Sequence, residues 1–145
     1  MNTQTTFFWR WLILVIIGTL LFGLNMIFLP NVTNGLFNAM FFPNTDINQI
    51  FSETAQHYLQ FTYGVLGAIM VGWASLMLYI ALRPFRRGER EAWTMITTSI
   101  IIWFVVDSAY SLYMGYIPNV VLNIIFLILY LIPLGATYRH FHHVQ

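Results

Sequence analysis

The chain of 145 residues contains no cysteine and no lysine, and it has few charged residues of any kind. The absence of cysteine excludes disulfides, thiolate catalysis and metal sites that depend on sulfur. Charged residues make up only 8% of the chain, whereas a soluble domain carries about a quarter. The formal net charge of +1 creates no strong field that would attract nucleic acid. The surface of this protein is therefore expected to face something other than water.

Long apolar segments take the place of the missing charge, because hydrophobic residues make up 59% of the chain. A helix needs about 20 mostly apolar residues to cross the hydrocarbon core of a bilayer. Four segments meet this requirement, at about residues 8–29, 59–82, 92–114 and 118–138. The first is longer than the core of a secretory signal, and no small-residue cleavage site follows it, so we expect it to be retained. The sequence thus predicts an all-α protein, a four-transmembrane-helix bundle that forms a single integral membrane domain over residues 1–145.

The six arginines predict which side of the membrane each end of the chain occupies. Arg10 precedes the first span, four arginines fill the link between the second and third spans, and Arg139 follows the fourth. The other two links, residues 30–58 and 115–117, contain no arginine. Because cytoplasmic links carry the excess of basic residues, both termini are expected in the cytoplasm. The basic link either sets only this topology or also binds anionic lipid headgroups, through Arg83, Arg86, Arg87 and Arg90.

The outer link, residues 30–58, is too long for a simple turn and is expected to be partly helical. Apolar residues recur in it at helical spacing, which predicts a short interfacial helix with its apolar face in the outer headgroup layer. The residues of this face are Val32, Leu36, Phe37, Met40 and Phe41. The alternative is an ordered lid over the bundle.

Capping residues and a proline mark the expected ends of the second long helix. Asn44 or Thr45 is expected to cap a helix that runs through Ala55 into the second span. Pro84 is expected to end that span, because proline cannot continue the hydrogen-bond ladder of a helix.

Asp107 is the only acidic residue inside a predicted span, about eight residues and roughly 12 Å from the outer end. An ionisable side chain at this depth is costly, which makes it a functional hypothesis by default. No arginine lies at the same depth, so neutral hydrogen bonds or a bound cation must compensate the carboxyl group. The other spans contribute amides and hydroxyls at this level, which predicts a polar funnel open to the outside, with Asn119 and His57 at its mouth. The predicted ligand-binding residues are Asp107, Trp103, Tyr110, Ser111, Asn25, Gln60, Tyr63 and Asn123.

Two features have a structural alternative. The carboxyl group of Asp107 binds a ligand or a proton, or it bonds to Asn25, Asn123 or a tyrosine and so fixes the register of the helices, or it makes a contact in an oligomer. The small residues of the second span recur every four residues, a pattern that lets helices approach closely. They either pack against a helix or leave room for a ligand, and they are Gly64, Ala68 and Gly72.

Three functions remain open on these residues. The first is a binding protein or carrier for a small amphiphile, a lipid or a cation. The second is a structural or accessory subunit that docks a second copy, or another membrane protein, on the small-residue face of the second span. The third, an intramembrane enzyme, has the least support because the sequence offers no paired carboxylates, nucleophile motif or metal triad. No cofactor is indicated, and no histidine lies within a span to ligate haem.

The segments RPFRRGEREAW and WFVVDSAYSLYMGYIPNVVLN resemble small four-helix membrane proteins of bacteria, a group that includes the loosely defined DoxX-like relatives. The resemblance covers the second to fourth spans, about half of the chain. It is carried by the arginine-rich link, by Trp103 with Asp107, and by Asn119 with Asn123. It implies a multi-pass protein of the bacterial inner membrane. It implies no settled activity, so no catalytic residue is carried over.

Overall fold

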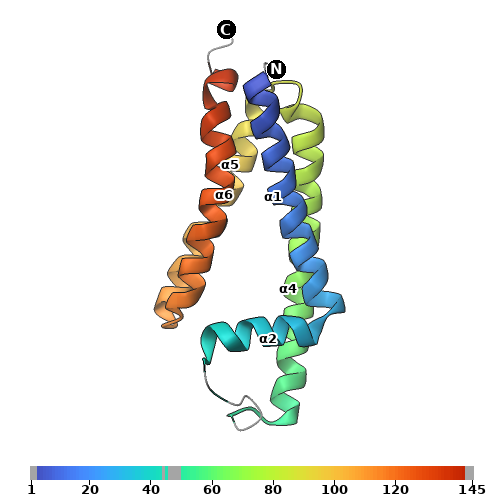
Figure 1. Cartoon of the computed structure of the whole chain (residues 1–145), viewed down its shortest axis with the longest axis vertical. Coiled ribbons are helices and arrows are strands. Elements are labelled where there is room, and N and C mark those ends of the chain that lie inside the picture. The colour runs from blue at the N-terminus through green and yellow to red at the C-terminus, as the bar shows by residue number, and fades with distance from the viewer. Residues whose placement is uncertain (1–2, 44, 46–49, 143–145) are drawn as a thin grey trace. The chain divides into compact units, whose positions relative to one another are not determined.

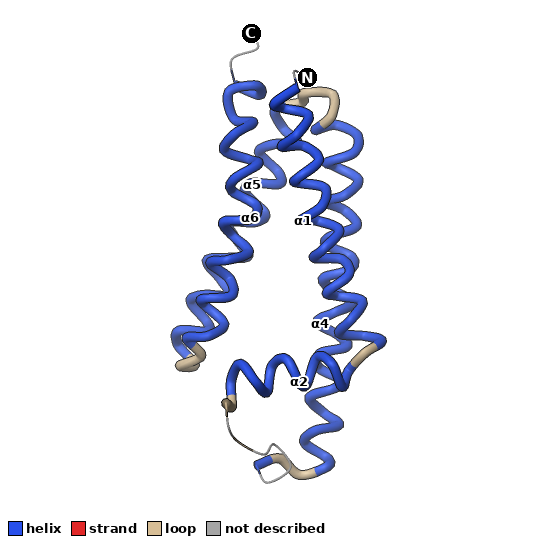
Figure 2. Tube along the Cα trace, viewed as in Figure 1, coloured by secondary structure: helices blue, strands red, loops and turns tan. Residues whose placement is uncertain are grey.

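The computed structural model describes residues 3–43, 45 and 50–142, and all regular secondary structure among them is helical (Figures 1 and 2). The prediction of an all-α chain is confirmed for this part of the sequence. In chain order the elements are α1 (Thr3–Phe28), α2 (Pro30–Phe41), α4 (Glu53–Ile80), the π-helix η1 (Ala81–Phe85), α5 (Arg90–Tyr113) and α6 (Ile117–His142).

Among the described residues, four helices are long and apolar enough to cross a membrane, as predicted: α1, α4 together with η1, α5 and α6. The shortest of them, α5, has 24 residues, which corresponds to about 36 Å of helix against about 30 Å of hydrocarbon core. In the most apolar 18-residue stretch of each helix, only 22–28% is buried inside the chain. Most of their apolar surface therefore faces outward, which is the pattern of an integral membrane protein.

The predicted boundaries of the spans are too short at several ends. The first helix begins at Thr3 rather than at residue 8, the second at Glu53 rather than at residue 59, and the fourth continues to His142 rather than to residue 138. Hydropathy marks only the apolar part of a helix, whereas these helices continue through polar turns that suit the headgroup layers. The third helix agrees with its prediction to within two residues at its start, which is Arg90.

The chain divides into two compact units, Met1–Ile17 with Leu76–Gln145 as unit 1 and Gly18–Ser75 as unit 2. Both α1 and α4 contribute residues to each unit. We describe the two units separately.

In unit 1, α5 and α6 pack against each other as a hairpin joined by a tight turn at Gly115. Gly115 has a φ of 79°, which glycine adopts without steric cost. The amide of Tyr116 donates to the carbonyl of Ser111 at 2.8 Å, and the amide of Gly115 donates to that of Leu112 at 3.1 Å. These two bonds form a Schellman motif, which satisfies the last carbonyls of α5 and sets where α6 begins.

The expectation that Pro84 ends the second long helix is wrong, because Pro84 lies inside η1 and the helix continues to Phe85. In an α-helix the carbonyl of Ile80 would point at Pro84, which has no N–H and would clash with it. A π-helix pairs each carbonyl with the residue five positions later, so Ile80 meets the N–H of Phe85 instead. The local widening lets the helix pass its proline. The chain then turns at Gly88, which has a φ of 81°.

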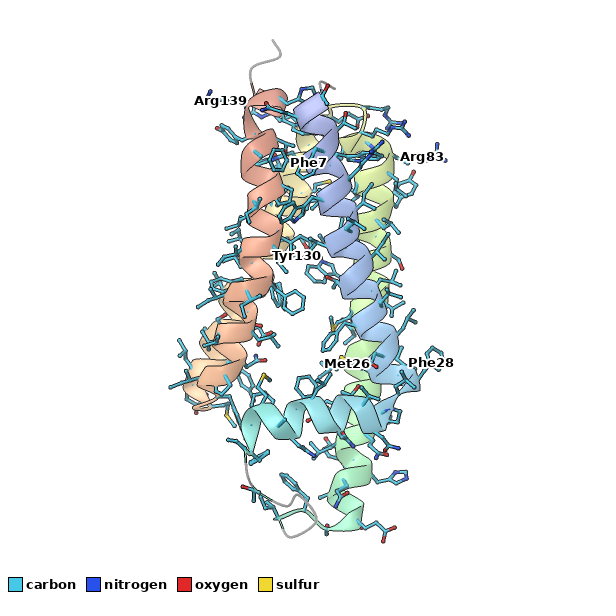
Figure 3. All side chains as sticks on the ribbon, in the orientation of Figure 1. Phe7, Met26, Phe28, Arg83, Tyr130 and Arg139 are labelled. Atoms are coloured by element: carbon cyan, nitrogen blue, oxygen red, sulfur yellow. The ribbon has the colours of Figure 1, made fainter. Side chains whose placement is uncertain are left out.

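The arginine-rich end of unit 1 is held together by aromatic contacts between α1, η1 and α6. The indole of Trp9 donates to the carbonyl of Ala81 at 2.8 Å. The ring centroids of Phe85 and Phe141 are 4.5 Å apart. These contacts bring the start of α1, the link after η1 and the end of α6 to one end of unit 1, where Figure 3 labels Arg83 and Arg139. All six arginines therefore occupy the same end of unit 1.

In unit 2, the second half of α1 packs against α4 at two glycines. A Cβ atom on Gly67 would lie 2.5 Å from the carbonyl oxygen of Gly23, and one on Gly23 would lie 2.9 Å from that of Gly67. Only glycine fits at either position, because real Cβ atoms do not approach a backbone oxygen so closely. The close approach of α1 and α4 in unit 2 thus depends on Gly23 and Gly67.

The link over residues 30–58 contains α2, which packs on the rest of unit 2 through one side. The centroid of the Phe37 ring lies 4.9 Å from that of Tyr63 and 6.4 Å from that of Phe22. Val32 and Leu36, which belong to the same predicted apolar face, are exposed by 50% and 54%. The predicted single apolar face is therefore divided, with Phe37 turned toward the protein and Val32 and Leu36 turned outward.

The start of α4 differs from its prediction. Phe51 and Ser52 are not helical, so no helix runs from Thr45 through Ala55, and α4 begins at Glu53. The hydroxyl of Ser52 accepts the N–H of Ala55 at 3.3 Å, which makes Ser52 the N-cap. Asn44, the other predicted cap, lies outside the described residues.

Candidate functional site

Asp107 lies in unit 1 within a small polar cluster formed by α5 and α6. Its Oδ1 atom accepts hydrogen bonds from the hydroxyl of Ser111 at 3.1 Å and from the amide nitrogen of Asn119 at 3.0 Å. The same nitrogen of Asn119 also donates to the hydroxyl oxygen of Ser111 at 2.8 Å. The three side chains close a ring of hydrogen bonds, which we call the Asp107 cluster.

Two features of the hairpin place these residues together. Asp107 and Ser111 are four residues apart on α5, so they lie on the same helical face. Asn119 is the third residue of α6, and it is as far beyond Gly115 as Ser111 is before it. A tight turn between antiparallel helices brings such residues side by side. Within the cluster, Asp107 lies six residues before Tyr113, the last residue of α5. This corresponds to a rise of about 9 Å along the helix axis.

A second polar contact joins the same two helices deeper in the hairpin. The amide of Asn123 donates to the hydroxyl of Ser108 at 3.2 Å. Both side chains are buried, with 3% and 7% of their surface exposed. Asn123, predicted to bind a ligand, is therefore occupied in joining α5 to α6, while Asp107 and Asn119 are only partly buried.

The other predicted residues of unit 1 differ in their exposure. Trp103 lies one turn before Asp107 on α5 and is partly buried. Tyr110 is 64% exposed and turns outward. No hydrogen bond joins Tyr110 to the Asp107 cluster among the described residues. A ligand that contacts Tyr110 would therefore lie against the exposed side of α5.

Three predicted residues, Asn25, Gln60 and Tyr63, belong to unit 2. The amide of Asn25 donates to the hydroxyl of Thr33 at 3.1 Å, and Thr33 is almost fully buried. This bond fixes the corner between α1 and α2. Tyr63 packs on Phe37 of the same unit. A funnel that includes both these residues and Asp107 stays a prediction.

The small-residue face of α4 is open. Among the described residues, no atom outside the immediate helix backbone lies within 4 Å of a Cβ placed on Gly64 or Gly72, and Ala68 is exposed. The close contact within unit 2 uses Gly67 instead. If Gly64, Ala68 and Gly72 pack against a helix, it is none of the described helices of unit 2.

Most arginines at the arginine-rich end have no ion-pair partner among the residues that the structure describes. Among the described residues the only ion pair joins Arg87 to Glu89, at 2.6 Å, and both side chains are well exposed. The guanidinium of Arg86 lies 5.2 Å from the centre of the Trp9 ring, a cation–π contact. The charge of the basic link is therefore available to an external anion.

No group of three or more histidine, cysteine, aspartate or glutamate side chains that could hold a metal ion occurs in the described part of the chain. Comparisons with protein-family models, with curated proteins and with solved structures find no match for this chain. The resemblance of the link and third span to DoxX-like proteins stays a prediction.

Sequence reasoning placed Asn119 at the mouth of the funnel and did not predict its bond to Asp107. It also missed Ser108 as the partner of Asn123. The sequence does contain a feature that predicts the contact between α5 and α6. Ser111 and Asn119 are the same number of residues from Gly115, on either side of it. Recognising Gly115 as the end of α5 would have paired these residues across the hairpin.

Proposed function

We propose that this integral membrane protein binds a small amphiphile, a lipid or a cation at the Asp107 cluster. The proposal includes its place in the membrane: a multi-pass protein of a bacterial inner membrane, with the arginine-rich end and both termini in the cytoplasm. The Asp107 cluster then lies toward the outer leaflet. The arginine count supports this orientation, because no arginine occurs near the hairpin turn at Gly115.

The observation that carries the proposal is the half-satisfied carboxyl group of Asp107. Its Oδ1 atom accepts two hydrogen bonds, while its Oδ2 atom has no hydrogen-bond partner among the described residues. An acidic side chain within a membrane span is retained at a cost and commonly marks a binding or transport site. An oxygen atom left without a partner at this depth is available to a ligand.

A purely structural role explains the cluster less well. The hairpin already has a fully buried polar contact, between Ser108 and Asn123, that fixes how α5 packs on α6. A neutral amide or hydroxyl suffices for such a contact. An acidic residue that is only partly buried adds the cost of a charge without being needed for packing.

The experiment compares the wild type with Asp107→Asn, which keeps the shape of the side chain and removes its charge. Melting temperatures are measured on the delipidated protein and again after a bacterial lipid extract is added. Glu91→Gln is the matched control, because it makes the same chemical change in the exposed first turn of the same helix.

We expect the lipid extract to raise the melting temperature of the wild type and of Glu91→Gln, and to raise that of Asp107→Asn much less. The delipidated proteins should melt alike. An equal response of all three proteins would overturn the proposal. A large loss of stability in delipidated Asp107→Asn would instead assign Asp107 a structural role.

A second candidate function, a structural or accessory subunit, is favoured by the open small-residue face of α4. In the part of the chain that the structure describes, a Cβ atom on Gly64 or Gly72 would meet nothing within 4 Å, and Ala68 between them is exposed. Small residues spaced in this way allow a partner helix to approach closely in a membrane. The partner is a second copy of the chain or another membrane protein.

Gly72→Leu tests this second function, since it places a large side chain on the open face, where a Cβ atom at position 72 meets no described atom within 4 Å. Loss of a dimer or of a co-purified partner, with the monomer still folded, would support docking on α4. An unchanged assembly would exclude this face as the docking surface.

A further inference from the structure

The hydrogen-bond inventory of the Asp107 cluster defines what kind of ligand can complete it. An asparagine amide has two N–H donors, a serine hydroxyl has one O–H donor, and a carboxylate has none. The amide nitrogen of Asn119 donates to Asp107 and to Ser111, and the hydroxyl of Ser111 donates to Asp107. Each of these hydrogen bonds therefore has both of its partners inside the cluster.

Two acceptor atoms of the cluster have no partner among the described residues, the Oδ2 atom of Asp107 and the Oδ1 atom of Asn119. An anionic group at the site would meet the carboxyl group of Asp107. A ligand that completes the cluster must donate hydrogen bonds, and a positive charge strengthens those bonds.

We propose that the ligand of the Asp107 cluster carries a primary ammonium group, an inference that rests on the proposed function above. A primary ammonium supplies three N–H donors on one positive centre. A quaternary ammonium has the same charge but no N–H donor, so the cluster distinguishes the two groups by their hydrogen bonds.

A bare metal ion fits the site less well. Calcium takes about six to eight oxygen ligands and magnesium about six, whereas the cluster offers two open oxygens. The described residues include no group of three acidic or histidine side chains that would add further ligands. An organic cation needs no such coordination shell.

Apolar residues beside the cluster indicate that the ammonium belongs to an amphiphile. Val106 and Tyr110 flank Asp107 on α5 and are each 64% exposed. Such surfaces meet acyl chains in a bilayer. An ethanolamine phospholipid and a soluble amine share the ammonium chemistry, and the experiment separates these two sources.

The test uses a series of phospholipids with identical acyl chains and phosphate, in which the amine of the ethanolamine headgroup is methylated once, twice and three times. Each methyl group removes one N–H donor and leaves the charge. Binding to the full-length protein in a neutral detergent is measured by native mass spectrometry. Free ethanolamine and free choline, tested by their effect on the melting temperature, form the soluble arm.

We expect binding to fall along the series, by about tenfold or more between the primary and the quaternary headgroup, because N–H bonds to the carboxylate are lost. Asp107→Asn should flatten the series, and Glu91→Gln should leave it unchanged. If only free ethanolamine stabilises the wild type, and choline does not, the same chemistry is assigned to a soluble amine.

Two other outcomes overturn the inference in different ways. Equal binding of all four headgroups by the wild type, weakened throughout in Asp107→Asn, would reject the ammonium and keep the site. Binding that is the same in the wild type and in Asp107→Asn would reject the site itself. The wild-type series decides the headgroup on its own, even if the variant does not fold.

Discussion

The indole N–H of Trp11 donates to the carbonyl oxygen of Leu129 at 3.2 Å, across unit 1 from α1 to α6. Leu129 is the residue whose carbonyl would bond to position 133 in an α-helix, and position 133 is a proline. Pro133 therefore leaves this carbonyl without a helical donor, and Trp11 supplies one. A defect in one helix is repaired by a side chain of another, which joins α1 to α6 at a defined height.

We predict that Trp11→Phe lowers the free energy of unfolding by about 1 kcal/mol, because it leaves the carbonyl of Leu129 unpaired. Pro133→Ala restores the helical donor, so the same change should cost much less in that background. The measurement is unfolding in mixed micelles for the two single variants and the double variant.

Trp93→Phe is the matched control for this cycle. The indole of Trp93 also donates to a backbone carbonyl, that of Leu134, at 2.9 Å. That carbonyl has another donor in the hydroxyl of Thr137 at 3.2 Å. Trp93→Phe should therefore cost less than Trp11→Phe, and equal costs would contradict the role assigned to Pro133.

The glycines of unit 2 give a second prediction, in which two similar substitutions have opposite effects. Gly67→Ala places a Cβ atom 2.5 Å from the Gly23 carbonyl oxygen. It should destabilise the protein by about 1–3 kcal/mol, because α1 and α4 must separate locally. Gly64→Ala meets nothing within 4 Å and should be neutral or stabilising by up to about 1 kcal/mol. Unfolding of both variants in the same detergent checks this order, and the reverse order would contradict the packing of α1 on α4 in unit 2.

These details show how far the sequence alone reaches. The four spans follow from composition, because only apolar segments of sufficient length can cross a bilayer. The position of the arginines at one end of unit 1 can also be predicted from the sequence, because successive links of a chain that crosses a membrane lie on alternate sides of it. Neither inference needs to know which helix contacts which.

The partners of polar residues could not be predicted in the same way. The bond between Asp107 and Asn119 depends on the rotation of α5 and α6, which the Schellman turn at Gly115 sets. The effect of Pro84 was misjudged because a π-helix accommodates proline at a cost that hydropathy does not reveal. The exposed apolar faces of a membrane protein give little periodicity from which to read rotation.

The absence of cysteine makes the topology directly testable, since each introduced cysteine is then the only thiol in the chain. We predict that Met114→Cys, beside the hairpin turn, reacts with a membrane-impermeant maleimide added to spheroplasts. Glu91→Cys, in the first turn of α5, should react only after lysis. The reverse pattern would place the arginine-rich end outside and contradict the proposed orientation.

The basic link predicts binding of anionic lipids at the opposite end of unit 1. Arg83 and Arg90 have no ion-pair partner among the described residues, whereas Arg87 pairs with Glu89. Arg83→Gln and Arg90→Gln should each weaken the binding of phosphatidylglycerol by about fivefold, corresponding to about 1 kcal/mol. Arg87→Gln should have a smaller effect, because its charge is already partly neutralised. Native mass spectrometry of the three variants measures this, and equal binding by wild type and all variants would leave the link with topology as its only role.

The central claim, that the Asp107 cluster binds a ligand, is tested most directly by native mass spectrometry of gently solubilised protein, with wild type and Asp107→Asn prepared side by side. We predict a discrete additional mass on the wild type that is absent from the variant, and that mass would identify the ligand. Identical spectra without a retained ligand, together with an unchanged oligomeric state and melting temperature, would contradict the claim.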